Sequence, residues 1–343
     1  SGARFTERRS RVERKIGIYE KALDPGPLGN MFGAGAKLGF DFFEISVDES
    51  DMRLARLDWN AQERKNILKS ARDAGIRLFS MCFSGQRRFP MGSADRDIEK
   101  ISVEMMKKAI ELAYDLGIRV IQVAGYDVFY EPHTEETGKR FEENLMHSAR
   151  LAEQNGIMLS IETVEKYVTS VEKAVEIVEK ADSPWLTVYP DVANLYMMGY
   201  APEKELQKAQ GHMTALHMRD VPDDGYIPLG EGELDFDRVF SVLDEIKFGG
   251  PLIVELWSDQ YEDTAAALTQ APDVPDTIPV SRGEEEQVGL SYSLPDSFLL
   301  AKGEGAALNC RVQLPESLEA PLEEGQSVGS VQVYTGETQL GEY

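Results

Sequence analysis

The sequence predicts an α/β fold in which a (β/α)8 TIM barrel is followed by a small all-β domain. Short apolar runs rich in β-branched residues alternate with helical patterns, which is typical of a parallel sheet with crossover helices. Eight such repeats fit the length of about 250 residues that a closed barrel needs. After Trp257 the pattern changes to short β runs separated by Pro and Gly, which is typical of a small β module.

The predicted division of the chain follows these changes in pattern. We expect a basic N-terminal extension over 1–14, the barrel over 15–263, a linker over 264–277 and the small all-β domain over 278–343. The extension is polar and basic, which favours a solvated arm. The Pro-rich stretch APDVPDTIP, which begins at Ala271 inside the linker, is typical of a connecting segment.

Eight strands and the helices between them can be placed in order. The predicted strands are KIGIYEKAL, FFEISVD, RLFSMCFSG, VIQVAGYD, SIET, VYPDVAN, ALHMRD and PLIVELW. Helices are expected in PGPLGNMFGAGAKLGF, at about 60–74, 97–116, 135–154, 170–180 and 202–209, and in FDRVFSVLDEI. The first should be weak, because each interior Gly costs about 0.5–1 kcal/mol relative to Ala. YEDTAAALTQA is too short for a full closing helix.

Composition restricts the class of partner. The chain has 343 residues, 42% hydrophobic and 28% charged, as in ordinary globular proteins. It has no apolar run of about 18 residues and no apolar leader, so we expect no membrane partner. Two distant cysteines, Cys82 and Cys310, indicate reduced thiols and a cytoplasmic location. The net charge of −24 argues against nucleic-acid binding.

Four strand ends carry side chains that ligate metals: Glu162, Asp191, His217 and Glu255. The strand C-termini of a closed barrel open on one face, so these side chains should converge there. Three carboxylates and one imidazole suit a hard divalent cation such as Mn²⁺, Mg²⁺ or Co²⁺. The alternatives are four locally capped polar residues, a structural metal or a buried ion-pair network.

Two of these carboxylates could also carry protons. Glu162 and Glu255 come from strands five and eight, on opposite sides of the barrel mouth. A cation that binds the carbonyl and neighbouring hydroxyl of a ketose acidifies the proton between them and stabilises an enediolate. One glutamate can remove that proton and the other can return it to the opposite face, which favours epimerisation.

Several stretches resemble a known family. KIGIYEKAL, FDFFEISVDESDMRLARLDW, CFSGQRRFPMGS, RVIQVAGYD, YPDVANL, ALHMRD, PLGEGELDF and IVELWS resemble the L-ribulose-5-phosphate 3-epimerases, which are xylose-isomerase-like TIM barrels. The resemblance covers about 15–262. It implies interconversion of L-xylulose 5-phosphate and L-ribulose 5-phosphate in ascorbate degradation. It also implies the same four metal ligands, with Glu162 and Glu255 as the acid/base pair.

The chain departs from the family in three places: the glycine-rich first helix, Gln86 where a His is expected, and the short closing helix. Candidates for contacting the phosphate are Arg87, Arg88 and Arg219, although each could instead be solvated or ion-paired. Asn194 and the loop over 228–233 are expected to line the mouth. The expected partner is thus a small sugar phosphate, and the protein could form a homo-oligomer.

Other functions remain open from the sequence. An aldose–ketose isomerase on the same barrel would move the proton between C1 and C2. A phosphodiesterase or AP endonuclease would need more histidines than the four present, and a basic groove. A non-catalytic fusion with the β tail as an interaction module is a further alternative.

The tail has a resemblance of its own. SLEAPLEEGQSVGSVQVYTGETQLGEY resembles the C-terminal β domain of D-alanyl-D-alanine carboxypeptidases of the penicillin-binding-protein 5 type. The resemblance is to that β domain alone, so it implies no peptidase activity.

Overall fold

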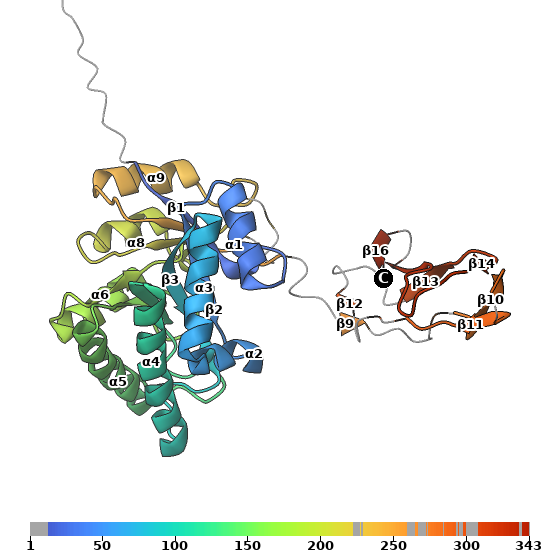
Figure 1. The fold of residues 1–343 in the computed structure, drawn as a ribbon. Helices are drawn as coiled ribbons and strands as arrows, with labels where there is room; N and C mark the ends of the chain where they lie inside the picture. Colours follow the sequence, from blue (N-terminus) through green and yellow to red (C-terminus); the bar gives the residue numbers. More distant parts are fainter. Residues whose placement is uncertain are drawn as a thin grey trace, which may run out of the picture. The chain divides into compact units, whose positions relative to one another are not determined.

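The computed structural model describes residues 13–221, 227, 229–258, 265–266, 272, 274–283, 285–292, 294, 298–299, 308–335 and 338–342. The chain divides into two compact units, Ser1–Ser258 and Asp259–Tyr343 (Figure 1).

The first unit contains an eight-stranded parallel barrel. Its strands are β1 (Ile16–Tyr19), β2 (Phe42–Val47), β3 (Arg77–Phe83), β4 (Val120–Ala124), β5 (Met158–Glu162), β6 (Leu186–Tyr189), β7 (Leu216–Met218) and β8 (Leu252–Val254). They pair in the order β6-β5-β4-β3-β2-β1-β8-β7. Parallel bridges from Val188 to Met213 and from Asp191 to His217 join β6 to β7. The predicted (β/α)8 barrel is therefore confirmed.

Helices surround these strands (Figure 1). They are α1 (Leu28–Lys37), α3 (Ala61–Ala74), α4 (Arg96–Leu116), α5 (Glu135–Gln154), α6 (Val171–Ala181), α8 (Pro202–Lys208) and α9 (Phe236–Glu245). Local sequence fixes their ends. Asn60 and Glu63 form a capping box at the start of α3, and Gly75 ends that helix in the left-handed conformation.

The helix expected in the glycine-rich stretch is present as α1, and it buries Met31 and Phe32. Short helices that were not predicted follow two strands: α2 (Asp51–Leu54) with the 3-10 helix η2 (Ala55–Asp58), and α7 (Val192–Met197). Another 3-10 turn, η1 (Glu20–Ala22), follows β1, and η3 (Gly85–Arg87) follows β3. The predicted short closing segment over 261–271 lies outside the described residues, except for β9 (Ala265–Ala266).

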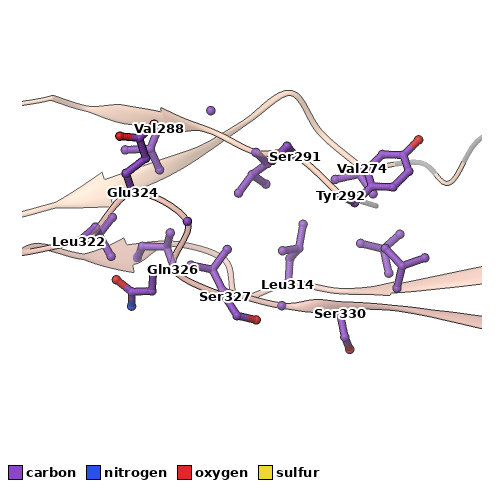
Figure 2. A pocket seen from close by; sticks show the side chains of 18 of the residues that line it. Val274, Val288, Ser291, Tyr292, Leu314, Leu322, Glu324, Gln326, Ser327 and Ser330 are labelled. Atoms are coloured by element: carbon purple, nitrogen blue, oxygen red, sulfur yellow. The ribbon is translucent and has the colours of Figure 1, made fainter. Parts of the chain in front are cut away.

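The second unit is built of short strands, as predicted. They are β10 (Thr277–Ser281), β11 (Gln287–Gly289), β12 (Phe298–Leu299), β13 (Leu308–Gln313), β14 (Leu318–Glu319), β15 (Ser330–Thr335) and β16 (Thr338–Glu342). They form the sheets β11-β10-β14 and β13-β15-β16, and β12 pairs with β9. A cavity of about 740 Å³ lies in this unit, lined by aliphatic side chains such as Val288 and Leu314 and by polar ones such as Glu324 and Gln326 (Figure 2). Among the described residues, its lining includes no His or Cys.

None of the helices in the described part of the chain is both long enough and apolar enough to cross a membrane.

Candidate metal centre

The four side chains predicted at the strand ends converge in the barrel. Glu162 ends β5, Asp191 lies two residues beyond β6, His217 is in β7 and Glu255 directly follows β8. One ligand atom from each lies within 4.8 Å of those of the other three, and all four residues are buried. The structure thus brings these four residues together.

Asp191 is fixed by the backbone around it. It caps the N-terminus of α7, and its Oδ1 accepts hydrogen bonds from the backbone N–H groups of Ala193 (2.8 Å) and Asn194 (2.9 Å). Its own N–H donates to the Thr163 hydroxyl. Because Asp191 lies directly opposite His217 across the β6–β7 bridge, the pair is set by the register of the barrel.

The imidazole of His217 lies between carboxylates on both of its edges. Nδ1 is 2.6 Å from Glu162 Oε1 and 3.4 Å from Glu255 Oε2. Nε2 is 2.7 Å from Glu44 Oε1, on the other edge of the ring. The ring also packs edge-on against Tyr189, with 4.6 Å between ring centroids.

Arg219 lies beside the same cluster. Its Nε donates to Asp191 Oδ2 at 3.0 Å and is 3.6 Å from Glu255 Oε2. Its Nη2 donates to Asn194 Oδ1 at 2.5 Å. Burial acts to lower the pKa of Arg219, but Asp191 and Glu255 outweigh it and raise that pKa, so the guanidinium stays charged.

The crowded carboxylates differ in their affinity for protons. Burial raises the pKa of Glu162, and it raises the pKa of Glu255 further, with help from the nearby negative charges. Burial acts in the same direction on Asp191, but Arg219 and His217 outweigh it, and the pKa of Asp191 is lowered. Burial acts to lower the pKa of His217, but the carboxylates around it raise that pKa well above its usual value.

This donor set fits a divalent cation. Three buried carboxylates within 4.8 Å of one another repel each other, and a like-charged cluster of this kind is stable only with protons or cations among the oxygens. Oxygen donors with one imidazole suit Mg²⁺, Mn²⁺ or Co²⁺, and the absence of thiolate among them disfavours softer metals. A cation and the Nδ1 proton of His217 would compete for the same lone pair.

The predicted phosphate contacts lie in different surroundings. Arg87, in η3, is half-buried, with its guanidinium over the rings of Tyr126 and Phe129. Its Nε has no hydrogen-bond partner among the described residues, and neither does the side-chain amide of its buried neighbour Gln86. Arg88 is half exposed and donates to Asp51 at 2.6 Å. Arg219 and Asn194 are bonded to each other next to the candidate ligands.

The loop at 229–233 is held by a residue that sequence reasoning missed. Asp220 Oδ2 accepts hydrogen bonds from the backbone N–H groups of Gly230 and Gly232, each at 2.9 Å. A Cβ on Gly232 would lie 2.1 Å from Val221 O, so only glycine fits there. Burial acts to raise the pKa of Asp220, but the backbone N–H groups of Leu234, Val221, Gly232 and Gly230 outweigh it and lower that pKa. Pro228, also predicted to line the mouth, lies outside the described residues.

Two further polar residues under the cluster were also missed. Gln122, in β4, donates from Nε2 to Glu162 Oε2. Glu44, in β2, is fully buried and contacts His217. The sequence signal that could have revealed them is a charged or amide residue inside a predicted buried strand, because burying such a side chain without a partner is costly.

Comparison with known proteins shows the fold family of the barrel. The family described as the xylose isomerase-like TIM barrel matches residues 32–276. Two solved epimerases share the fold: D-psicose 3-epimerase (TM-score 0.63, 20% identity, 71% of this chain and 85% of that chain) and L-ribulose 3-epimerase (TM-score 0.59, 21% identity, 72% and 82%). The chain therefore belongs to the xylose isomerase-like TIM barrel family.

Sequence relatives define the family more closely. The chain is 40% identical over 262 residues to the L-ribulose-5-phosphate 3-epimerase UlaE of Escherichia coli SMS-3-5, over 75% of this chain and 92% of that protein. The same figures hold for UlaE of Shigella sonnei. The chain belongs to this L-ribulose-5-phosphate 3-epimerase family, which is part of the isomerase class. The predicted resemblance is confirmed.

The tail matches a different family. Residues 265–343 match the C-terminal domain of penicillin-binding protein 5, which confirms the resemblance predicted for this segment. The candidate ligands all precede this match.

Proposed function

We propose that this protein is a metal-dependent epimerase that inverts C3 of a ketopentose 5-phosphate, converting L-xylulose 5-phosphate to L-ribulose 5-phosphate. The observation that carries the proposal is the convergence of Glu162, Asp191, His217 and Glu255 within 4.8 Å at the strand ends. Kinship with UlaE supports the choice of substrate. Mn²⁺, Mg²⁺ and Co²⁺ are the cations that suit this donor set.

In this proposal the four residues would hold the cation through carboxylate oxygens and Nδ1 of His217. The cation, when bound, would stabilise negative charge on the sugar oxygens next to the reacting carbon and so acidify the C3 proton. Glu162 or Glu255 would remove that proton from one face. The other glutamate would return a proton to the opposite face, so the configuration at C3 is inverted.

Two features of the chain suit the glutamates to this work. Burial raises the pKa of both, so each can hold a proton nearer neutral pH than an exposed glutamate can. The Gln122 amide donates to the Glu162 oxygen that does not face His217, and it would fix the rotation of that carboxylate. Arg219 and Asn194 would orient Asp191 and the neighbouring sugar oxygens.

For the phosphate we propose Arg87, with Arg88 as a second cation that would have to leave Asp51. The support is the buried Nε of Arg87 and the buried Gln86 amide, neither of which has a partner in the described part of the chain. A buried polar group without a partner costs about 1–3 kcal/mol, and substrate oxygens would remove that cost. The proposal further includes a cytoplasmic location, supported by the free thiols of Cys82 and Cys310.

The test is an epimerisation assay on the full chain after chelation with EDTA. Activity should disappear on chelation and return with Mn²⁺, Mg²⁺ or Co²⁺. L-xylulose without the phosphate should react much more slowly, because a remote phosphate contributes binding energy that orients the reacting carbon. Full activity after exhaustive chelation would refute the metal, and equal rates on the two sugars would refute the phosphate site.

A further inference from the structure

Glu44 is a buried carboxylate that the proposed reaction does not use. It lies in the middle of β2, is fully buried, and faces the interior of the barrel rather than its mouth. Burying a charged carboxylate costs several kcal/mol unless hydrogen bonds and opposite charges compensate. Its presence in a buried strand, where the other polar residue is the uncharged Ser46, therefore needs a reason.

Three donors surround this carboxylate. Its Oε2 accepts hydrogen bonds from the hydroxyl of Tyr189 (2.8 Å) and from the hydroxyl of Ser80, which is directly opposite Glu44 in the β2–β3 register. Its Oε1 is 2.7 Å from His217 Nε2. The two hydroxyls occupy one oxygen, and among the described residues the other oxygen has a hydrogen bond only with the imidazole.

We infer that Glu44 is a positioning residue that keeps the proton of His217 on Nε2 and leaves the Nδ1 lone pair for the cation; this role rests on the proposed function. The geometry supports it directly. Nδ1 is the nitrogen that faces Glu162 and Glu255, and Nε2 points away from them toward Glu44. A hydrogen bond from the other ring nitrogen to a carboxylate fixes the tautomer and orientation of a metal-binding histidine.

The same geometry predicts what Glu44→Gln would do. A glutamine offers one acceptor oxygen instead of two. The Ser80 and Tyr189 hydroxyls both donate at the Oε2 position, so the amide oxygen would settle there and the NH₂ group would face Nε2. Nε2 would then have to accept, and the ring proton would move to Nδ1, where it blocks the cation.

The experiment measures Mn²⁺ affinity by titration calorimetry on the chelated full chain. Glu44→Gln should raise the dissociation constant about 10- to 100-fold, the usual effect of losing such a partner. The matched control is Glu20→Gln. Glu20 is equally buried but bonds to Arg53 and Arg56, so that variant should stay within threefold of the unaltered chain.

A second measurement distinguishes loss of the positioning of His217 from a general disruption of the protein core. The ¹⁵N shifts of His217 in the Mg²⁺-loaded protein should report a proton on Nε2, and in Glu44→Gln the proton should move to Nδ1. If Glu44→Gln does not fold, Tyr189→Phe replaces it. That variant removes one hydrogen bond from Glu44 and should weaken Mn²⁺ binding several-fold.

The outcomes distinguish this inference from the proposed function. If Glu44→Gln leaves both the Mn²⁺ affinity and the His217 tautomer unaltered, the role of Glu44 is overturned. Where Tyr189→Phe replaces that variant, unaltered Mn²⁺ affinity has the same meaning. Either result leaves the proposed metal centre standing. An unaltered chain that does not bind Mn²⁺ at all would overturn both.

Discussion

At the scale of single residues, the site depends on buried charges held at fixed distances. Glu162 and Glu255 are both buried beside His217, so each can act on a substrate without competition from bulk water. The pKa of Asp191 is lowered, whereas the pKa values of the two glutamates are raised. In the proposed mechanism all four residues hold the cation, and the raised pKa values suit the two glutamates to carry protons as well.

Replacing either glutamate should stop turnover while the fold survives. Glu162→Gln and Glu255→Gln each keep the side-chain shape but remove the proton carrier, so we expect kcat to fall at least about 100-fold at saturating Mn²⁺. The assay uses L-xylulose 5-phosphate, and circular dichroism checks folding. Glu205→Gln is the matched control, because Glu205 is a buried glutamate that contacts the start of α6 instead of the site. Near-normal rates in either site variant would exclude a two-base mechanism.

Metal binding should strengthen as pH rises. His217, Glu162 and Glu255 all have raised pKa values in the folded protein, so the site retains protons that a cation must displace. These groups bind more protons in the folded than in the unfolded chain. In the unfolded chain their pKa values are the ordinary ones, about 4.3 for Glu and about 6.5 for His. Their contribution to the stability of the chelated protein is therefore lost as the pH rises above these values and through the raised pKa values of the folded protein.

The measurement is the thermal shift caused by Mn²⁺ at pH 6, 7 and 8. If one proton is released, the dissociation constant should fall about tenfold per pH unit, and the thermal shift should grow accordingly. A thermal shift that stays constant over this range would contradict the protonation pattern of the site.

At the scale of elements, periodicity predicted most of the barrel. The long helices α4 and α5 were predicted because their apolar spacing extends over several turns, and the eight strands were predicted as short apolar runs between helical patterns. The short helices α2 and α7 were not, because four to six residues are too few to show a helical period.

The site was predictable only in part. Its four clustered residues were found because each lies at a strand end, where ligands collect in this fold. Glu44 and Gln122 lie inside strands, and a strand pattern alone does not reveal which partner a buried polar side chain has. Their contacts come from barrel closure, which places residues far apart in sequence next to each other.

Substitutions in helix α1 can measure how much its glycines lower the free energy of unfolding. Gly33 is exposed, and a Cβ there would meet nothing within 4 Å, so Gly33→Ala should stabilise the protein by about 0.5–1 kcal/mol. Gly35 is the matched control, because a Cβ there would lie 3.1 Å from Ile76 Cδ1 and crowding should cancel the gain. Urea denaturation of both variants measures the difference. No gain from Gly33→Ala would show that α1 is not limited by helix propensity.

At the scale of the whole molecule, the chain joins two units of different kinds. The barrel unit contains all four residues of the candidate centre, and the second unit contains short strands that match a β domain from another family. The two units are therefore expected to have separate functions.

Epimerase activity should survive removal of the tail. A chain that ends at Asp273 retains every proposed ligand and substrate contact, although it loses the β12 partner of β9. We expect the same kcat and KM as for the full chain, measured side by side. An insoluble or inactive truncated protein would mean that the tail supports the barrel.

The most direct test of the central claim is hydrogen exchange in D₂O with L-xylulose 5-phosphate. An epimerase must break the C3–H bond, so deuterium should enter at C3 of both substrate and product. The label should depend on added Mn²⁺ and should be lost in Glu162→Gln and Glu255→Gln. Deuterium at C1 or C2 instead would contradict the account and identify an aldose–ketose isomerase, and no incorporation at all would leave a protein that binds without reacting.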